Sequence, residues 1–191
     1  MIREQIRPTL VSFVLLTLLT GVAYPLFVTG IAQMLFKNQA NGSLIFGDSK
    51  PIGSEFIGQP FDDPKYLWGR PSATSPTYNA SSSSGSNYGP MNPDYLKGVE
   101  ARMKALKAVD PGNSAPIPVD LVTASASGLD PHISLAGAYY QVPRIARVRG
   151  ISENTIKTII HKNTEDRFMK VIGEPVVNVL KVNLDLDSYK Q

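Results

Sequence analysis

The chain has 191 residues, the size of one domain with an appendage, and is too short for a multidomain enzyme. It contains no cysteine, which excludes disulfides, thiolate metal sites, iron–sulfur clusters and cysteine nucleophiles. The net charge is +3, from 19 Lys and Arg against 16 Asp and Glu, and the basic residues are spread along the chain, so the charge is weak evidence for a polyanionic partner.

The first predicted element is a membrane-spanning helix. No charged residue lies between Arg7 and Lys37, and this stretch exceeds the roughly 20 apolar residues that cross a bilayer. A cleaved signal peptide is the alternative, but its apolar region would run only about 7–15 residues. We therefore expect residues 1–37 to form a short N-terminal tail and one anchor helix, and residues 38–191 to form one soluble domain.

The predicted helix contains a proline and small residues in its interior. Pro25 frees a carbonyl group, which in a membrane must be satisfied by neighbouring helices or by local adjustment. Small residues such as Gly21 and Gly30 permit close approach of another helix. The sequence therefore predicts a kinked helix that packs on another protein, with Gly21, Tyr24, Pro25 and Gly30 as partner contacts.

Basic residues on the two sides of the helix predict its orientation. Arg3 and Arg7 precede the helix, whereas Lys37 alone follows it directly. Positive charges favour the cytoplasmic side, so we expect a cytoplasmic N-terminus and a single-pass chain in the bacterial inner membrane. The soluble domain is then periplasmic.

The first part of the soluble domain, residues 38–90, is rich in Gly, Pro, Ser and Asn. Apolar islands at residues 44–46, 56–57 and 66–68 predict short strands or turns. Residues 74–90 have the composition of a flexible linker, and an ordered binding loop is the alternative because Tyr78 and Tyr88 interrupt it.

Three helices are predicted in the second part. The first follows a cap at Asn92 and ends at Pro111-Gly112, and the third follows a cap at Ser152. The second runs from a cap at Ser134 to Gly150, with a break near Gln141 because Pro143 cannot continue the hydrogen bonding. Apolar residues at 117–124 and alternation at 176–186 predict two strands. The expected fold is therefore one N-terminal transmembrane helix plus a single α/β (α+β) soluble domain with about three helices and a small sheet.

One stretch, RIARVRGISENTIKTII, imitates a helix-turn-helix, with Arg144, Arg147 and Arg149 available for phosphate contact. A domain outside the membrane meets no chromosomal DNA, so we expect no nucleic-acid partner. The two histidines, His132 and His161, are separated by a helix and fit no metal-binding spacing, so no metal site is predicted.

Catalytic motifs are also missing from the sequence. A hydrolase interpretation of Ser125, Ser127 and the neighbouring Gly-Leu-Asp is not supported, because there is no G-x-S-x-G. There is no G-x-x-x-x-G-K-[ST] loop either, so ATP binding by this chain alone is unsupported. We assign no catalytic residue, and a membrane-anchored binding module unrelated to transport stays an alternative.

Several phrases spread over nearly the whole chain form a specific combination. They are GVAYPLF, ANGS at 40–43, IGQ-x-F at 57–61, W-GRPSAT at 68–74, SGSN at 84–87, PVDLVTASASGLDPHIS at 118–134, Q-x-PR-x-A-x-x-RG at 141–150 and GEPVVNVLKVNLDLD at 173–187. Together they resemble the C subunit of the bacterial Kdp potassium-transporting P-type ATPase. SGSN departs slightly from the SGGSN that members often carry.

The resemblance implies one span, an external domain, and two partners: a channel-like potassium-conducting subunit and a P-type ATPase subunit. Potassium would be the ion that the complex transports. The chain itself lacks the D-K-T-G phosphorylation motif and a T-V-G-Y-G filter, so the resemblance implies an accessory subunit.

Two mechanisms are open for such a subunit. In the first, the helix clamps the pump subunits and the domain covers the external potassium entrance. In the second, which the resemblance also implies, the chain is a catalytic chaperone that raises the ATP affinity of the ATPase subunit, and Gln141 helps to hold nucleotide. ATP is cytoplasmic whereas the charge asymmetry places Gln141 outside, so we favour the first.

One arginine is assigned to partner contact within the first mechanism. Arg70 begins a loop, residues 69–87, that is dense in hydroxyl and amide oxygens and contains no carboxylate. A weak lid near a channel mouth suits such a loop better than a tight cation cage. Arg70 would repel potassium, so we expect it to pair with a carboxylate of this domain or of the channel-like subunit.

Overall fold

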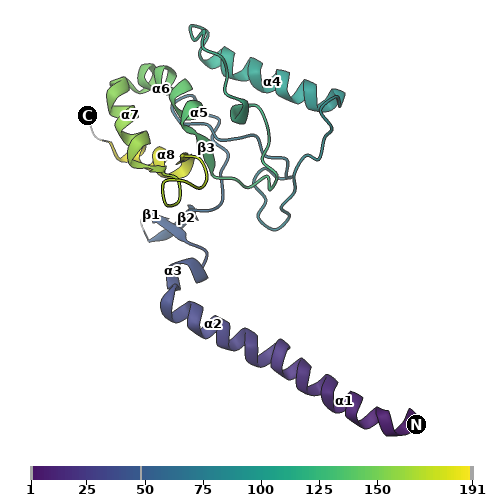
Figure 1. Cartoon of the computed structure of the whole chain (residues 1–191). Helices are drawn as coiled ribbons and strands as arrows, with labels where there is room; N and C mark the ends of the chain where they lie inside the picture. Colours follow the sequence, from purple (N-terminus) through teal and green to yellow (C-terminus); the bar gives the residue numbers. More distant parts are fainter. Residues whose placement is uncertain (1, 48, 190–191) are drawn as a thin grey trace. The chain divides into compact units, whose positions relative to one another are not determined.

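The computed structural model describes residues 2–47 and 49–189. It divides into two compact units, one of residues 1–44 and one of residues 45–191, and each is described by itself. Figure 1 shows the elements of both. The first unit is helical, whereas the second combines helices with small sheets, which confirms the expected fold class.

The first unit is dominated by one long apolar helix. It consists of α1 (Ile2–Leu18), a π-helical turn (Leu19–Ala23) and α2 (Tyr24–Leu35), and a short α3 (Lys37–Ala40) follows. The stretch Arg3–Leu35 is the one helix of the described chain that is long and apolar enough to cross a membrane, and none of its side chains is buried in the unit.

The π-helical turn lies directly before Pro25. The backbone N–H of Tyr24 donates to the carbonyl of Leu19, five residues back, instead of the four of an α-helix. Pro25 has no N–H to give to the carbonyl of Gly21, so the α-helical pattern cannot run through this point. The interruption predicted from Pro25 therefore takes the form of a wider turn, a feature that is common at functional positions of helices.

The second unit begins with a two-stranded sheet of β1 (Leu44–Gly47) and β2 (Lys50–Ser54). The apolar island at residues 44–46 is thus a strand, as predicted. The islands at residues 56–57 and 66–68 belong to no named strand; Ile57 makes an isolated bridge with Ser54. Residues 66–68 are instead held by side chains described below.

Three predicted helices are present, and their caps are those expected. Helix α4 (Pro93–Val109) is capped by Asn92, whose side chain accepts from the N–H groups of the first turn. The predicted break at Gln141 separates α5 (Leu135–Tyr140) from α6 (Val142–Arg149), with Ser134 as the first cap. Helix α7 (Glu153–Lys162) is capped by Ser152. A short side chain that accepts from the first turn stabilises each helix start.

A three-stranded antiparallel sheet joins distant parts of the second unit. Its order is β3 (His132–Ser134), β5 (Val176–Asn178) and β4 (Thr164–Glu165), so β5 is central. Val177 lies opposite Ile133 on one side and Thr164 on the other. Ile133 and Val177 are almost fully buried, which places the sheet in the core.

The strand predicted at 176–186 is wrong beyond its first three residues. After Asn178 the chain turns into helix α8 (Val179–Ser188), and the Asn178 side chain caps it by accepting from the N–H of Lys181. The buried positions recur at Val179, Val182 and Leu186, the spacing of a helix face. The residues of this segment also alternate between apolar and polar types, and that alternation predicted a strand instead of a helix.

The strand predicted at 117–124 is also wrong. This segment contains a single 3-10 turn, Val119–Leu121, in which Leu121 is buried. Pro116 and Pro118 have no N–H to donate to a neighbouring strand. The carboxylate of Asp120 accepts from the N–H of Ser134 at 2.6 Å. The segment therefore supports the start of α5 rather than extending the sheet.

Candidate functional site

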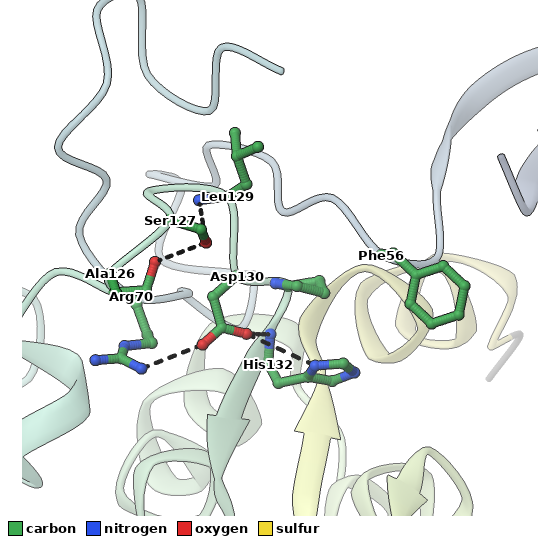
Figure 2. A pocket seen from close by; sticks show the side chains of 9 residues that line it. Phe56, Arg70, Ala126, Ser127, Leu129, Asp130 and His132 are labelled. Carbon is green, nitrogen blue, oxygen red and sulfur yellow. Dashed lines mark hydrogen bonds and ion pairs between the residues drawn. The ribbon is translucent and has the colours of Figure 1, made fainter. Parts of the chain in front are cut away.

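A hollow of about 510 Å³ lies beside the loop that carries the Ser125–His132 segment. Figure 2 shows the side chains around it. They are Phe56, Arg70, Ser125, Ala126, Ser127, Leu129, Asp130, Pro131 and His132. This hollow gathers the sequence-predicted Arg70 and the longest of the phrases that carried the resemblance.

Arg70 fixes the loop by three hydrogen bonds. Its Nη1 donates to Oδ2 of Asp130 at 3.1 Å, while Nη2 and Nε donate to the carbonyls of Ala124 and Thr123 at 3.2 and 3.4 Å. The expected pairing of Arg70 with a carboxylate of its own domain is therefore present, within the hollow (Figure 2). All three bonds hold the loop, so the arginine has a structural role whatever else it contacts.

Asp130 is held from its other side by His132. The backbone N–H of His132 donates to Oδ1 of Asp130 at 3.0 Å, and Nδ1 of the ring lies 3.6 Å from the same oxygen. Burial by itself would raise the pKa of Asp130, but these bonds and the Arg70 charge outweigh it and hold the pKa below the ordinary 3.8. Asp130 is thus an anion that organises the turn.

The two serines at the hollow are used to shape the loop. Oγ of Ser125 accepts from the N–H of Gly128 at 2.9 Å, and Oγ of Ser127 accepts from the N–H of Leu129 at 3.1 Å. Gly128 has a φ of +68°, and a Cβ there would approach the Ser84 carbonyl to 2.7 Å. The serine hydroxyls therefore act as acceptors that shape the turn.

The loop from Gly69 to Asn87 is ordered by its own hydroxyl groups. Oγ of Ser72 donates to the Gly128 carbonyl at 2.7 Å and accepts from the N–H of Tyr78 at 3.1 Å. Oγ1 of Thr74 donates to the Pro76 carbonyl at 2.9 Å, and the Tyr78 hydroxyl donates to the Arg70 carbonyl at 2.6 Å. The hydroxyl groups of Ser72, Thr74 and Tyr78 are thus engaged within the domain and order this part of the loop, and its role in binding stays a prediction.

Gln141 lies in the interior, with 1% of its surface exposed. Its Oε1 accepts from the N–H of Trp68 at 2.9 Å and from Arg144 at 2.6 Å, and its Nε2 donates to the carbonyls of Trp68 and Gly137, both at 3.1 Å. A side chain with four such bonds is fully satisfied.

Asn183 bonds the backbone of Leu67 in the same way as Gln141 bonds that of Trp68. Its Oδ1 accepts from the N–H of Leu67 at 2.8 Å, and its Nδ2 donates to the carbonyl of Leu67 at 2.9 Å. Each amide thus bonds both polar groups of one backbone residue, as a neighbouring strand would. Gln141 and Asn183 therefore hold the segment Leu67–Trp68 where a neighbouring strand would otherwise bond it.

Two guanidinium groups lie against Trp68. Arg144 is 1% exposed, and its Cζ lies 4.8 Å from the ring centroid; that of Arg102 lies at 5.0 Å. Burial lowers the pKa of Arg144 to about 10, so it stays charged at neutral pH, and it also donates to the Pro64 carbonyl. Cation–π contacts of this kind strengthen when desolvated.

The other arginines of the helix-turn-helix-like stretch are also engaged within the domain. Arg147 donates to Asp110 at 2.8 Å, and Arg149 donates to Asp187 at 2.7 Å and to two backbone carbonyls. No group of three or more His, Asp or Glu suited to a metal occurs among residues 2–47 and 49–189.

The predicted partner contacts of the membrane helix lie in the first unit and are all exposed there. Tyr24 and Pro25 follow the π-helical turn, and Gly21 lies within it. A Cβ added at Gly21 or Gly30 would meet nothing within 4 Å. The space beside both glycines is therefore open to another helix.

Comparison with known proteins identifies the family. The family model described as "K+-transporting ATPase, c chain" (KdpC) matches residues 6–188. Proteins named potassium-transporting ATPase KdpC subunit match almost end to end: that of Methylibium petroleiphilum is 62% identical over 97% of this chain and 98% of its own, and that of Polaromonas naphthalenivorans 60% identical over 98% and 96%. The Methylococcus capsulatus protein is 56% identical over 98% and 99%.

The chain belongs to the KdpC family. The resemblance seen in the sequence is therefore confirmed. In this KdpC chain the phrases GRPSAT and SASGLDPH are joined by the Arg70–Asp130 pair and by the bond from Ser72 to the Gly128 carbonyl. The role of Gln141 toward nucleotide stays a prediction.

Asn183 and Arg144 are the residues whose roles sequence reasoning missed. The available signal for Asn183 was its position four residues after Val179 and three before Leu186, on one helix face. For Arg144 it was the spacing of three from Gln141 in the QVPR phrase. The alternation at residues 176–186 placed Asn183 on the polar side of a strand, and Arg144 was expected to be available for phosphate contact, because polar side chains are rarely buried without partners.

Proposed function

We propose that this chain is a non-catalytic accessory subunit of an ATP-driven potassium uptake pump. Its relatives are named as subunits of potassium-transporting ATPases. In this proposal it assembles and stabilises the pump and couples a channel-like potassium-conducting subunit to a P-type ATPase subunit. No catalytic residue of the pump is assigned to this chain.

The observation that carries the proposal is the unburied membrane helix with its two open glycines. Gly21 and Gly30 are nine residues apart, about 14 Å or two and a half turns along an α-helix, so close approach is possible at two levels and on different faces of the helix. The π-helical turn that contains Gly21 leaves backbone carbonyls less regularly bonded than in an α-helix. A helix that faced lipid alone would need neither feature.

The orientation in this proposal is the one that the basic residues predict. Arg3 and Arg7 lie in the cytoplasm, and the second unit lies in the periplasm. On that side the Arg70–Asp130 loop is available to the external face of the potassium-conducting subunit. The transported ion is then potassium, and the chain carries no cofactor of its own.

The catalytic-chaperone alternative requires Gln141 to contact ATP. All four hydrogen bonds of its amide are made inside the domain, so such contact would need the Leu67–Trp68 segment to detach. Breaking buried hydrogen bonds without replacement costs about 1–3 kcal/mol each. The geometry therefore supports a structural role for Gln141 and favours the assembly mechanism.

The decisive experiment replaces each glycine singly. Gly21→Leu and Gly30→Leu should each lower the recovery of intact pump from detergent extracts by affinity purification, because the new side chain prevents close helix approach. Val22→Leu and Thr29→Leu are matched controls that add bulk beside each glycine. Unchanged recovery with both glycine variants would contradict the proposal.

A further inference from the structure

A turn at residues 168–172 projects between β4 and β5, in the yellow-green stretch between α7 and α8 of Figure 1. Phe168 and Ile172 form an isolated antiparallel bridge, with reciprocal backbone hydrogen bonds of 2.9 and 3.0 Å. The turn is therefore closed by its own backbone. We name residues 168–172 the apolar tip.

The apolar tip exposes four large hydrophobic side chains in a run of five residues. The exposed fractions are 70% for Phe168, 76% for Met169, 77% for Val171 and 63% for Ile172. Single exposed hydrophobic residues are ordinary, but a contiguous group marks a surface that contacts another apolar phase or partner. The fifth residue, Lys170, is exposed as well.

The backbone of the apolar tip adopts conformations that its residue types do not favour. Met169 and Lys170 both have left-handed φ angles, +51° and +63°. Gly, Asn and Asp are the residues that adopt such angles readily in a tight hairpin. The conformation of the turn therefore does not by itself account for Met and Lys in these places.

The one charged side chain of the apolar tip, Lys170, suits a phosphate headgroup. Of the residues that flank the tip, Arg167 is paired with Glu174 at 2.6 Å and Asp166 precedes it, so the positive charge offered to lipid is that of Lys170. A lysine can place its aliphatic stem among acyl chains while its ammonium stays among phosphate headgroups. A purely apolar protein socket would have to bury that ammonium group.

The base of the hairpin lies beside the place where the chain enters the second unit. Lys181 pairs with Glu55, which follows β2, and lies 3.9 Å from Glu165 of β4. Asn178 of β5 also donates to the Glu55 carbonyl at 2.9 Å. Residues 36–44 alone separate the end of the membrane helix from this unit, and nine extended residues span at most about 30 Å.

We propose that the apolar tip inserts into the headgroup–acyl boundary of the anionic leaflet that faces the domain, as a second membrane contact besides the helix. Insertion of about 5–10 Å is typical of such segments. This contact restricts rotation of the domain about its short tether. It does not depend on the pump subunits, and so it is independent of the function proposed above.

The test uses the full chain reconstituted through its own helix into vesicles of phosphatidylethanolamine and phosphatidylglycerol. Because the chain has no cysteine, Met169→Cys provides one thiol for an environment-sensitive fluorophore. We expect a shift of emission to shorter wavelength and quenching by lipids that carry a nitroxide near the headgroup. A fluorophore at Lys107→Cys, on the exposed side of α4, should show neither.

Matched variants separate the tip from general effects of charge. Val171→Asp in the Met169→Cys background should abolish the lipid quenching. Val119→Asp makes the same change at a valine that is 70% exposed elsewhere in the unit and should leave the quenching intact. Circular dichroism melting of both variants shows that the fold is kept.

Two results would overturn the proposal. In one, the fluorophore at residue 169 stays accessible to aqueous iodide in vesicles and is shielded only when the potassium-conducting and ATPase subunits are co-reconstituted, which would make the tip a protein contact. In the other, it stays accessible to iodide in both preparations.

Discussion

Buried amides hold the segment Leu67–Trp68 in place of a β-strand. Gln141 and Asn183 each bond the N–H and the carbonyl of one backbone residue, and Arg144 completes the set through Oε1 of Gln141. Such a network stabilises the fold only when every member has its partner, because a polar group left without one is costly in the low-dielectric interior. Gln141 therefore stabilises the fold through this network.

Replacement of Gln141 separates stability from nucleotide contact. Gln141→Ala should lower the free energy of unfolding of the full chain by about 2–6 kcal/mol, because the N–H and the carbonyl of Trp68 both lose their partners, at about 1–3 kcal/mol each. Asn154→Ala, at an exposed position of α7, should change it by less than about 0.5 kcal/mol. Chemical denaturation in detergent measures both. Unchanged stability of Gln141→Ala combined with weaker ATP binding by the pump would support the chaperone mechanism instead.

Asp130 makes stability depend on pH in a defined direction. Hydrogen bonds from His132 and the Arg70 charge hold its pKa below 3.8 in the fold, against the effect of burial. The unfolded chain therefore binds the proton more readily, so the stabilisation is complete above the unfolded pKa and is lost as pH falls through the folded one.

Asp130→Asn should remove that part of the acid sensitivity. In unfolding measurements between neutral pH and the acid range, the difference in stability between wild type and variant should be constant near neutrality and shrink below about pH 4. Asp185, whose pKa is also lowered against the effect of burial by hydrogen bonds from Asn163 and Lys162, keeps its own contribution in both proteins. A difference that does not change with pH would show that Asp130 is not organised by these contacts.

At the scale of elements, the helices that begin with a clear cap were predictable from the sequence. Asn92, Ser134 and Ser152 each precede an apolar face at helical spacing and each accepts from the first turn. Helix α8 was not predictable in the same way. Its cap, Asn178, follows two strand residues directly, and its buried face contains Asn183, so alternation of residue type imitated a strand.

The candidate site was predictable only in part, for a related reason. The pairing of Arg70 with a carboxylate follows from the need to neutralise a charge inside a polar loop. The buried places of Gln141 and Arg144 depend on residues more than seventy positions earlier in the chain, Trp68 and Pro64. No local pattern in a single sequence reports such contacts.

Substitution at Asn178 tests the start of α8. Asn178→Ser keeps an oxygen that can accept from the N–H of Lys181, whereas Asn178→Ala removes it. We expect the alanine variant to be less stable than the serine variant by about 1 kcal/mol, the usual worth of a cap. Both lose the bond to the Glu55 carbonyl, so the comparison isolates the cap. Equal thermal unfolding of the two variants would show that α8 does not depend on it.

At the scale of the whole molecule, the main buried polar side chains have partners within the chain, whereas the exposed apolar side chains of two segments do not. In the interior of the second unit, Gln141, Arg144 and Asn183 are bonded to groups of the same unit. The membrane helix and the apolar tip expose apolar side chains that find no partner within their own units. This division suits a protein that acts through contacts with a bilayer and with other subunits.

The side of the membrane on which the second unit lies tests the account most directly, because an external domain cannot meet cytoplasmic ATP. Lys107→Cys in the assembled pump provides a single exposed thiol in this chain, on α4. The account predicts that a membrane-impermeant maleimide labels it in intact spheroplasts and not in sealed inside-out vesicles. Labelling in inside-out vesicles alone would place the domain in the cytoplasm, contradict the assembly mechanism as stated, and restore direct nucleotide contact.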